Sequence, residues 1–83
     1  MHAASKSLAL ELASRGITVN AVAPGIIATD MIEGSFDADL IKKIVPMQRA
    51  GRAVEVADLV GFLASDQAAY ISGQVISING AMI

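Results

Sequence analysis

The sequence Ile17-Thr-Val-Asn-Ala-Val-Ala-Pro-Gly-Ile-Ile-Ala-Thr29 contains the clearest structural signal in the chain. Residues 17–23 are mostly apolar or β-branched, which is typical of a strand buried on both faces. Pro24 and Gly25 end this strand, because proline lacks a backbone donor and glycine adopts angles that other residues avoid. The next residues form a loop at the carboxyl end of the strand, where ligands bind in open α/β sheets.

A helix is predicted immediately before this strand, over residues 3–14. Ala, Leu, Lys and Glu, which favour helices, dominate the segment. Ala4, Leu8 and Leu12 recur every four residues and would form one apolar stripe. Gly16 follows at the position where a left-handed residue commonly ends a helix. A helix, a glycine and a strand in succession are typical of a parallel α/β sheet.

Three more elements are predicted after the loop. A short helix over residues 38–44 ends before a proline, because the residue that precedes proline avoids the helical region. A longer helix over residues 54–65 leads to a strand over residues 74–79, with a glycine on either side of the strand. This order of elements predicts an α/β fold, in which the segment 17–79 is one parallel βαβ unit with a right-handed crossover. The residues that would form the buried stripe of the longer helix are Val56, Leu59, Val60 and Leu63.

The composition indicates one small domain that needs support from other surfaces. The chain has 83 residues, of which 54% are hydrophobic and 17% are charged. A chain of this length buries a modest share of its surface, so its stability alone would be marginal. Its apolar character excludes a disordered tail and fits elements covered on both faces. We expect residues 1–83 to be one incomplete domain, completed by a larger domain or by oligomerisation.

Several functional classes are disfavoured by the same composition. The net charge is −2 and the six Lys and Arg residues are scattered, so no nucleic-acid or membrane partner is predicted. No apolar run approaches the roughly 18–20 residues of a membrane-spanning helix, and no signal peptide is visible. Cysteine is absent and His2 is the only histidine, which argues against disulfides and a His/Cys metal site. We expect a cytoplasmic location.

A family resemblance runs through most of the chain. Thr18-Val-Asn-Ala-Val-Ala-Pro-Gly25 with Thr29-Asp-Met31 resembles the late strand and nicotinamide-side loop of the short-chain dehydrogenase/reductases, closest to the 3-oxoacyl-acyl-carrier-protein reductases. This resemblance implies the C-terminal βαβ part of a Rossmann-type, doubly wound parallel sheet that binds NAD(P). Further segments that match the family in order and spacing are Pro46-Met-Gln-Arg49, Phe62-Leu-Ala-Ser-Asp66, Tyr70-Ile-Ser-Gly-Gln74 and Ile78-Asn-Gly80.

The resemblance assigns the cofactor to the loop after the first strand. It implies that Pro24 and Gly25 shape this loop, and that the backbone of Ile27 meets the nicotinamide carboxamide. It places the hydroxyl of Thr29 near the carboxamide or the pyrophosphate. NADPH is favoured over NADH by the resemblance alone, because no residue of the chain selects between them. Taken without the resemblance, a Pro-Gly pair at a strand end is also typical of a plain turn.

Two other regions gain a role from the resemblance. Met31 and Ile32 would belong to a lid that closes over the substrate, and packing in the core is the equal alternative. The last strand, its tail and the first helix would contact other subunits in a homo-oligomer, which is a tetramer in the family. Where the family usually has a second glycine after Gly80, this chain has Ala81, so the turn after the last strand departs from the family pattern.

The family's catalytic Tyr-x-x-x-Lys pair is expected upstream of Met1. One alignment places His2 at the tyrosine and Lys6 at the lysine, on one face of a helix. A second alignment fits the sequence after Lys6 better. In it, Lys6 is a basic residue of the same helix, three turns after the catalytic lysine. An internal deletion that joins the two segments is a third possibility. The only tyrosine, Tyr70, has no lysine four residues later and is expected to pack before the last strand.

The charged residues around the start of the longer helix have two interpretations. Arg49, Gly51 and Arg52 could hold an anion, such as a phosphate or the acidic face of an acyl carrier. A solvated surface is the favoured interpretation. Glu55 and Asp58 lie near the helix start, where acidic side chains suit the positive end of the helix dipole.

Two functions follow from these expectations. The first is an oxidoreductase that reduces a ketone, either a small molecule or an acyl-carrier-bound one as in fatty-acid biosynthesis, by hydride transfer from NADP(H) or NAD(H). The chain would supply the nicotinamide-side loop, the lid and part of an oligomer interface, without a metal. The alternative is a non-catalytic partner subunit that assembles with full-length relatives. Because a Gly-rich phosphate-binding turn is missing, we expect the isolated chain to be inactive.

Overall fold

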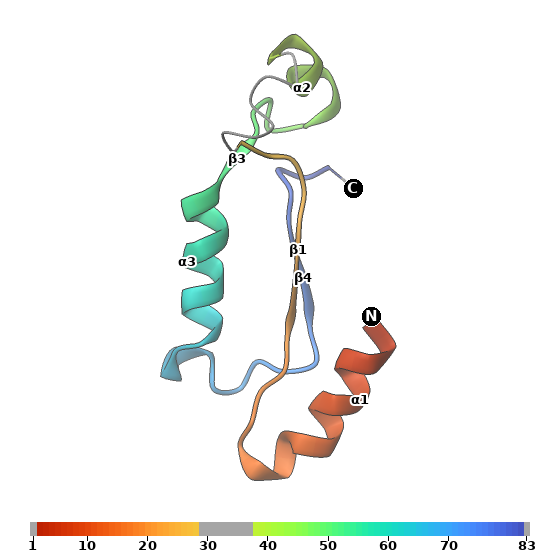
Figure 1. Cartoon of the computed structure of the whole chain (residues 1–83), viewed down its shortest axis with the longest axis vertical. Coiled ribbons are helices and arrows are strands. Elements are labelled where there is room, and N and C mark those ends of the chain that lie inside the picture. Colours follow the sequence, from red (N-terminus) through yellow and green to blue (C-terminus); the bar gives the residue numbers. More distant parts are fainter. Residues whose placement is uncertain (1, 29–37, 83) are drawn as a thin grey trace.

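The computed structural model describes residues 2–28 and 38–82 and has the predicted α/β architecture. Helices alternate with strands in the predicted order, and two very short strands are added (Figure 1). The helices are α1 (His2–Leu12), η1 (Ala13–Arg15), α2 (Ala38–Ile44), α3 (Ala53–Leu63) and η2 (Asp66–Ala68). The strands are β1 (Ala21–Pro24), β2 (Ile27–Ala28), β3 (Gly51–Arg52) and β4 (Val75–Ile78).

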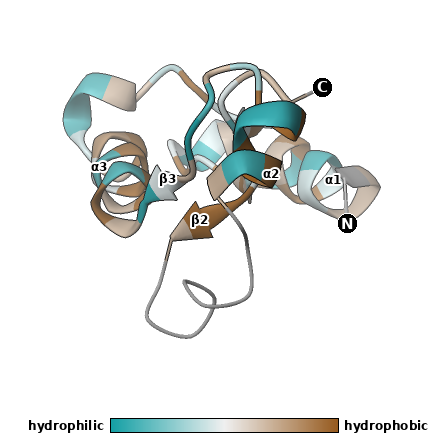
Figure 2. Ribbon diagram, turned by 90° about the horizontal axis from the view of Figure 1, so that it is seen from above, coloured by the Kyte–Doolittle hydropathy of each residue, from teal (hydrophilic) through white to brown (hydrophobic). Residues whose placement is uncertain are grey.

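The strands β1 and β4 form a parallel pair, although fifty residues separate them. Their register runs from Ala21 opposite Val75 to Pro24 opposite Ile78. Figure 1 shows α3 on one side of this pair and α1 on the other, and Figure 2 shows the same arrangement from above. The predicted parallel βαβ unit is therefore confirmed, with helices on both sides as in a doubly wound sheet.

The strand ladder of β1 begins four residues later than predicted. Before Ala21, the side chain of Asn20 attaches the chain to the turn that precedes β4. The side-chain amide of Asn20 donates to the carbonyl of Ile71 (3.0 Å), and its oxygen accepts from the amide of Gln74 (3.1 Å). The amide of Ala21 then donates to the carbonyl of Gln74 (2.8 Å), which starts the regular pairing. Asn20 is thus the junction between the turn and the sheet.

A second parallel pair, β2 with β3, was not predicted. Ile27 lies opposite Gly51, and Ala28 lies opposite Arg52. The amide of Gly51 donates to the carbonyl of Ile26 (2.9 Å). A Cβ at position 51 would lie 2.9 Å from Cδ1 of Ile27, so any other residue there would require this side chain to move. The pair escaped sequence analysis because two-residue strands carry no alternating pattern.

The described residues bury little side-chain surface. The chain exposes 6047 Å², whereas a compact protein of its mass would expose about 4,700 Å². Its radius of gyration is 15.3 Å, against about 12 Å for a compact chain of 83 residues. Only three apolar residues of the described part are buried, namely Ala9, Val45 and Ala68. The described residues therefore leave much apolar surface exposed that a neighbouring layer of structure could cover.

The predicted apolar stripe on α1 is wrong in detail. Ala9 is the buried residue of this helix, while Leu8 and Leu10 are exposed, Leu10 to 81%. Ala9 faces the turn before β4, because its Cβ would lie 3.6 Å from a Cβ added at Gly73. The predicted stripe on α3 is correct only in part, since Val60 is exposed. In Figure 2, hydrophobic residues colour β2 and much of α3.

Candidate functional site

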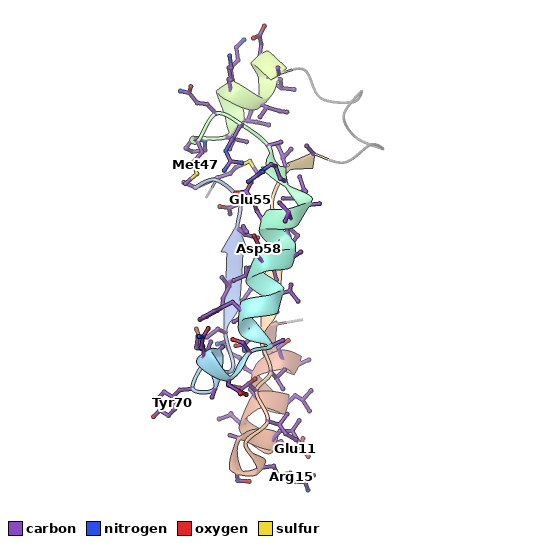
Figure 3. All side chains as sticks on the ribbon, turned by 90° about the vertical axis from the view of Figure 1, so that its left-hand side faces the viewer. Glu11, Arg15, Met47, Glu55, Asp58 and Tyr70 are labelled. Atoms are coloured by element: carbon purple, nitrogen blue, oxygen red, sulfur yellow. The ribbon has the colours of Figure 1, made fainter. Side chains whose placement is uncertain are left out.

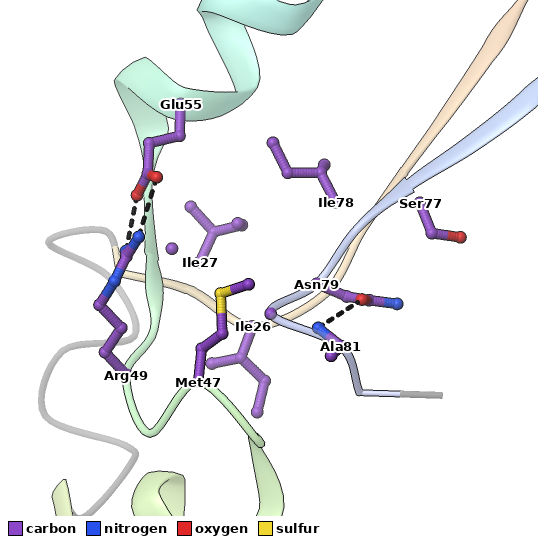
Figure 4. A pocket seen from close by; sticks show the side chains of 11 residues that line it. Ile26, Ile27, Met47, Arg49, Glu55, Ser77, Ile78, Asn79 and Ala81 are labelled. Carbon is purple, nitrogen blue, oxygen red and sulfur yellow. Dashed lines mark hydrogen bonds and ion pairs between the residues drawn. The ribbon is translucent and has the colours of Figure 1, made fainter.

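A pocket of about 330 Å³ opens at the carboxyl ends of β1 and β4 (Figure 4). Its walls come from the loop after β1, the connector before α3, the first turn of α3 and the end of β4. This is the edge where ligands bind in open α/β sheets, as predicted from the sequence. The apolar side chains that line it are Ile26, Ile27, Met47 and Ile78, and the polar ones are Arg49, Glu55, Ser77 and Asn79.

The turn at Pro24 and Gly25 lies beside this pocket and fixes the start of the loop. The amide of Gly25 donates to the carbonyl of Ile78 (3.0 Å). A Cβ at position 25 would lie 2.7 Å from Cβ of Asn79 and 3.0 Å from its Cα. The predicted reason for this glycine, an unusual backbone angle, is therefore wrong: among the described glycines with positive φ are Gly16, Gly73 and Gly80, and Gly25 is not one of them. Glycine is needed because the loop runs directly over Asn79.

Ile27 is the predicted cofactor-binding residue that the structure places in the pocket wall. Because it lies opposite Gly51 in a parallel ladder, and Gly51 bonds to the preceding carbonyl, the amide and carbonyl of Ile27 face away from β3. This orientation supports the predicted backbone contact with a carboxamide, which stays a prediction. The predictions for Thr29, Met31 and Ile32 lie outside the described residues.

The turn after β4 forms the opposite wall. The side chain of Asn79 accepts a hydrogen bond from the amide of Ala81 (3.1 Å) and donates one to the carbonyl of Met82 (3.0 Å). Gly80 and Ala81 both have left-handed backbones, with φ of 62° and 70°. Ala81 therefore adopts a left-handed conformation that a glycine would adopt more easily, so the residue that departs from the family pattern is strained.

The charged wall of the pocket is a tight ion pair between Arg49 and Glu55. Nη1 and Nη2 of Arg49 donate to the two carboxylate oxygens at 2.7 and 3.0 Å. The backbone amide of Arg52 donates to the same carboxylate (2.9 Å). These hydrogen bonds, that of Arg49 first, lower the pKa of Glu55 to about 2. The bond to Glu55 in turn raises the pKa of Arg49. Since Glu55 already engages Arg49, the structure favours a structural role for this arginine over an anion site.

Sequence analysis explained Glu55 by the helix dipole and did not predict its ion pair with Arg49. Glu55 is the third residue of α3 and accepts from the amide of Arg52 at the N-cap, which is half of a capping box. A guanidinium carries no acceptor, so the N-cap side chain cannot return the bond. The usual signature, Ser or Thr three residues before Glu, is therefore missing, and Arg49 lies outside the motif.

The opposite, amino-terminal end of the strands carries Lys6 and Tyr70. The ammonium group of Lys6 donates to the carbonyl of Gly73 (2.7 Å), two residues before β4. Six residues of nearly extended chain, about 20 Å, separate Gly73 from Asn79 at the pocket. This position favours the alignment in which Lys6 is not the catalytic lysine, which stays a prediction. Tyr70 is fully exposed and points away from the chain (Figure 3), so the predicted packing of its ring is wrong.

Two general features of the described part bear on function. None of its helices is long and apolar enough to cross a membrane. Within residues 2–28 and 38–82, no three His, Cys, Asp or Glu side chains are grouped so that they could hold a metal ion.

Comparison with known proteins identifies the family. Residues 1–82 match a family model described as enoyl-(acyl carrier protein) reductase. The chain belongs to the short-chain dehydrogenase/reductase family. The resemblance drawn from its motifs is therefore confirmed.

Relatives of this short-chain reductase chain include several 3-oxoacyl-(acyl-carrier-protein) reductases. The chain is 56% identical to the enzyme named FabG from Escherichia coli and 52% identical to that from Synechocystis, covering 94% and 95% of the chain. A solved structure of YwfH, an NADPH-dependent reductase involved in bacilysin biosynthesis, matches with a TM-score of 0.87 and 41% identity over 99% of the chain. The short-chain reductase chain spans about a third of the length of each of these relatives: 33% and 32% of the two enzymes, and 36% of YwfH.

Proposed function

We propose that this chain is the C-terminal part of an NADP(H)- or NAD(H)-dependent reductase that converts a ketone into a hydroxyl. The loop after β1 carries the proposal: Gly25 lies against Asn79, and Ile27 lines the pocket with its amide and carbonyl facing away from β3. Identity to 3-oxoacyl-(acyl-carrier-protein) reductases favours an acyl-carrier-bound ketone as substrate, with a small-molecule ketone as the broader class. NADPH is favoured because YwfH is an NADPH-dependent reductase.

The described residues fit one half of a dinucleotide site. The amide and carbonyl of Ile27 that face away from β3 would hold the nicotinamide carboxamide, whose carbonyl oxygen accepts and whose NH₂ group donates, while Pro24 and Gly25 fix the loop. When bound, the cofactor supplies the hydride. The apolar side chains of Ile26, Ile27 and Ile78 line this part of the pocket. The pocket walls contain no phenol, so the proton donor would be the tyrosine of a Tyr-x-x-x-Lys pair elsewhere in the complete enzyme.

Other parts of the proposal rest on the family resemblance. Thr29 would contact the carboxamide or the pyrophosphate, and Met31 and Ile32 would close over the substrate. β4 with its tail, and α1, would contribute to a homo-oligomer. The exposed leucines of α1 and the large exposed surface of the chain support such contacts.

A graft tests the proposed function. The matching 81 residues of the Escherichia coli enzyme are replaced by this chain, and reduction of an acetoacetyl thioester by NADPH is measured. We expect the graft to keep its activity within about tenfold, because substitutions that preserve a core are tolerated. A graft carrying Gly25→Ala should lose most activity, whereas Gly61→Ala, with open space around it, should not. A folded, oligomeric graft without activity would contradict the proposal.

A non-catalytic partner subunit is the second candidate function. The specific observation in its favour is the excess of exposed surface, about 1,400 Å² above that of a compact chain. A standard protein interface buries about 800 Å² on each partner, so the excess is sufficient for one. The test mixes the purified chain with the full-length Escherichia coli enzyme and follows both by size-exclusion chromatography. A chain that elutes as a monomer and apart from the enzyme would exclude this role.

A further inference from the structure

The connector between α2 and α3 is attached to the rest of the chain at three points. The amide of Met47 donates to the carbonyl of Gly80 (3.1 Å), and the amide of Gly51 donates to the carbonyl of Ile26 (2.9 Å). Between these two points, the guanidinium of Arg49 grips the carboxylate of Glu55 with two parallel hydrogen bonds. Each attachment lies on a wall of the pocket at the carboxyl end of β1 and β4.

We propose that Arg49 and Glu55 are positioning residues, which hold β3 at the start of α3 and thereby turn the backbone of Ile27 toward the ligand. The inference rests on the proposed function for the identity of that ligand. The structural connection from the ion pair through Gly51 to Ile26 and Ile27 does not depend on the proposed function.

The shortness of β2 and β3 is the first argument. Two residues on each side are far too few to form a stable pair, because even a full two-stranded hairpin is marginal in water. Something outside the pair must hold it together. Glu55 does so, because its carboxylate binds Arg49 on one side of β3 and the amide of Arg52 within β3.

The geometry of the pair is the second argument. Planar, bidentate contact between a guanidinium and a carboxylate fixes direction as well as distance, which a single-point contact would not. Both side chains line the pocket, and Figure 4 shows the pair beside Ile27. The side chain of Arg52, by contrast, lies 3.6 Å from the carboxylate and is mostly exposed, so it contributes charge without fixing direction.

Amide hydrogen exchange of the full 83-residue chain, measured by NMR, tests the proposal. In Glu55→Gln and in Arg49→Gln, the amide of Gly51 should exchange about tenfold faster, because its carbonyl partner on Ile26 is no longer held in place. The amides of Ala21 and Gly25, which bond across β1 and β4, should keep their rates. Arg52→Gln is the matched control and should leave all three amides unchanged.

Three results would overturn the proposal. These are an unchanged rate at Gly51 in Glu55→Gln, an equal acceleration at all three amides, and an unprotected Gly51 in the unsubstituted chain. The graft separates this inference from the proposed function. There, Glu55→Gln should raise the KM for NADPH by more than it lowers kcat, since the carboxamide contact is loosened. If the graft is inactive but Glu55→Gln accelerates exchange at Gly51 as expected, the proposed function alone is refuted. If the graft is active but Glu55→Gln leaves the exchange rate of Gly51 unchanged, the positioning role alone is refuted.

Discussion

The two ends of the β1–β4 pair are built by different means. At the amino end, polar side chains bond to backbone groups: Asn20 bridges two residues of the turn before β4, and Lys6 holds a carbonyl of the same turn. At the carboxyl end, glycines allow other segments to pack closely against the backbone. Gly25 lies against Asn79, and a Cβ at Gly80 would lie 2.8 Å from Val45.

The difference shows which end is suited to a ligand. Side-chain bonds at the amino end satisfy backbone groups that the ladder leaves open. Close packing at the carboxyl end instead brings the loop and the tail together around a pocket, beside which the amide and carbonyl of Ile27 face away from β3. Steric changes should therefore be most damaging at the carboxyl end, and hydrogen-bond deletions at the amino end.

Gly25→Ala is expected to have the largest effect. The new methyl group would overlap Asn79, and the free energy of unfolding should fall by about 2–3 kcal/mol through overpacking. Urea denaturation followed by circular dichroism measures the change. Gly61→Ala is the matched control: this glycine is exposed inside α3, and alanine there should raise the stability by about 0.5–1 kcal/mol. Equal effects at the two positions would remove the steric explanation of the carboxyl end.

Asn20→Ala tests the amino end and should rank second. It removes two hydrogen bonds and leaves the carbonyl of Ile71 and the amide of Gln74 without this partner, at a cost of about 2 kcal/mol. Gln74→Ala keeps the backbone amide that Asn20 accepts from and should cost less than about 0.5 kcal/mol. The same denaturation experiment compares the two. If Gln74→Ala is as damaging as Asn20→Ala, the junction does not depend on the asparagine side chain.

The sequence predicted the carboxyl end better than the amino end, for a physical reason. A proline and a glycine after a β-branched run mark a strand end locally, so the position of the pocket could be inferred from residues 17–25. Asn20 acts across more than fifty residues, and nothing near it in the sequence names its partners. The Arg49–Glu55 pair was missed because it joins a connector to a helix start without a standard capping motif. The exposed Leu8 was misjudged because periodicity predicts an apolar face without showing what covers it.

Ala81→Gly should produce a smaller, stabilising effect at the carboxyl end. Ala81 has φ of 70°, which costs an alanine about 1–2 kcal/mol, and glycine recovers this cost less its larger unfolded-state entropy. We expect a net gain of about 0.5–1 kcal/mol in the free energy of unfolding. Ala64→Gly offers a contrast, because residue 64 has φ of −84° and glycine there should not stabilise. A loss of stability in Ala81→Gly would mean that the turn is held by something other than its backbone angle.

The smallest effect expected is the pH dependence of the Arg49–Glu55 pair, since Arg49 is exposed and Glu55 is only partly buried. The pKa of Glu55 is lowered from about 4.5 to about 2 by hydrogen bonds from Arg49 and Arg52. Its contribution to stability is therefore complete above pH 4.5 and is lost as the pH falls toward 2. The difference in thermal midpoint between the unsubstituted chain and Glu55→Gln should be constant from pH 7 to 5 and should shrink below pH 4.5. If this difference in thermal midpoint were unchanged at pH 2.5, the charge of the carboxylate would not hold β3. The close contacts of the glycines would then be what stabilises the carboxyl end.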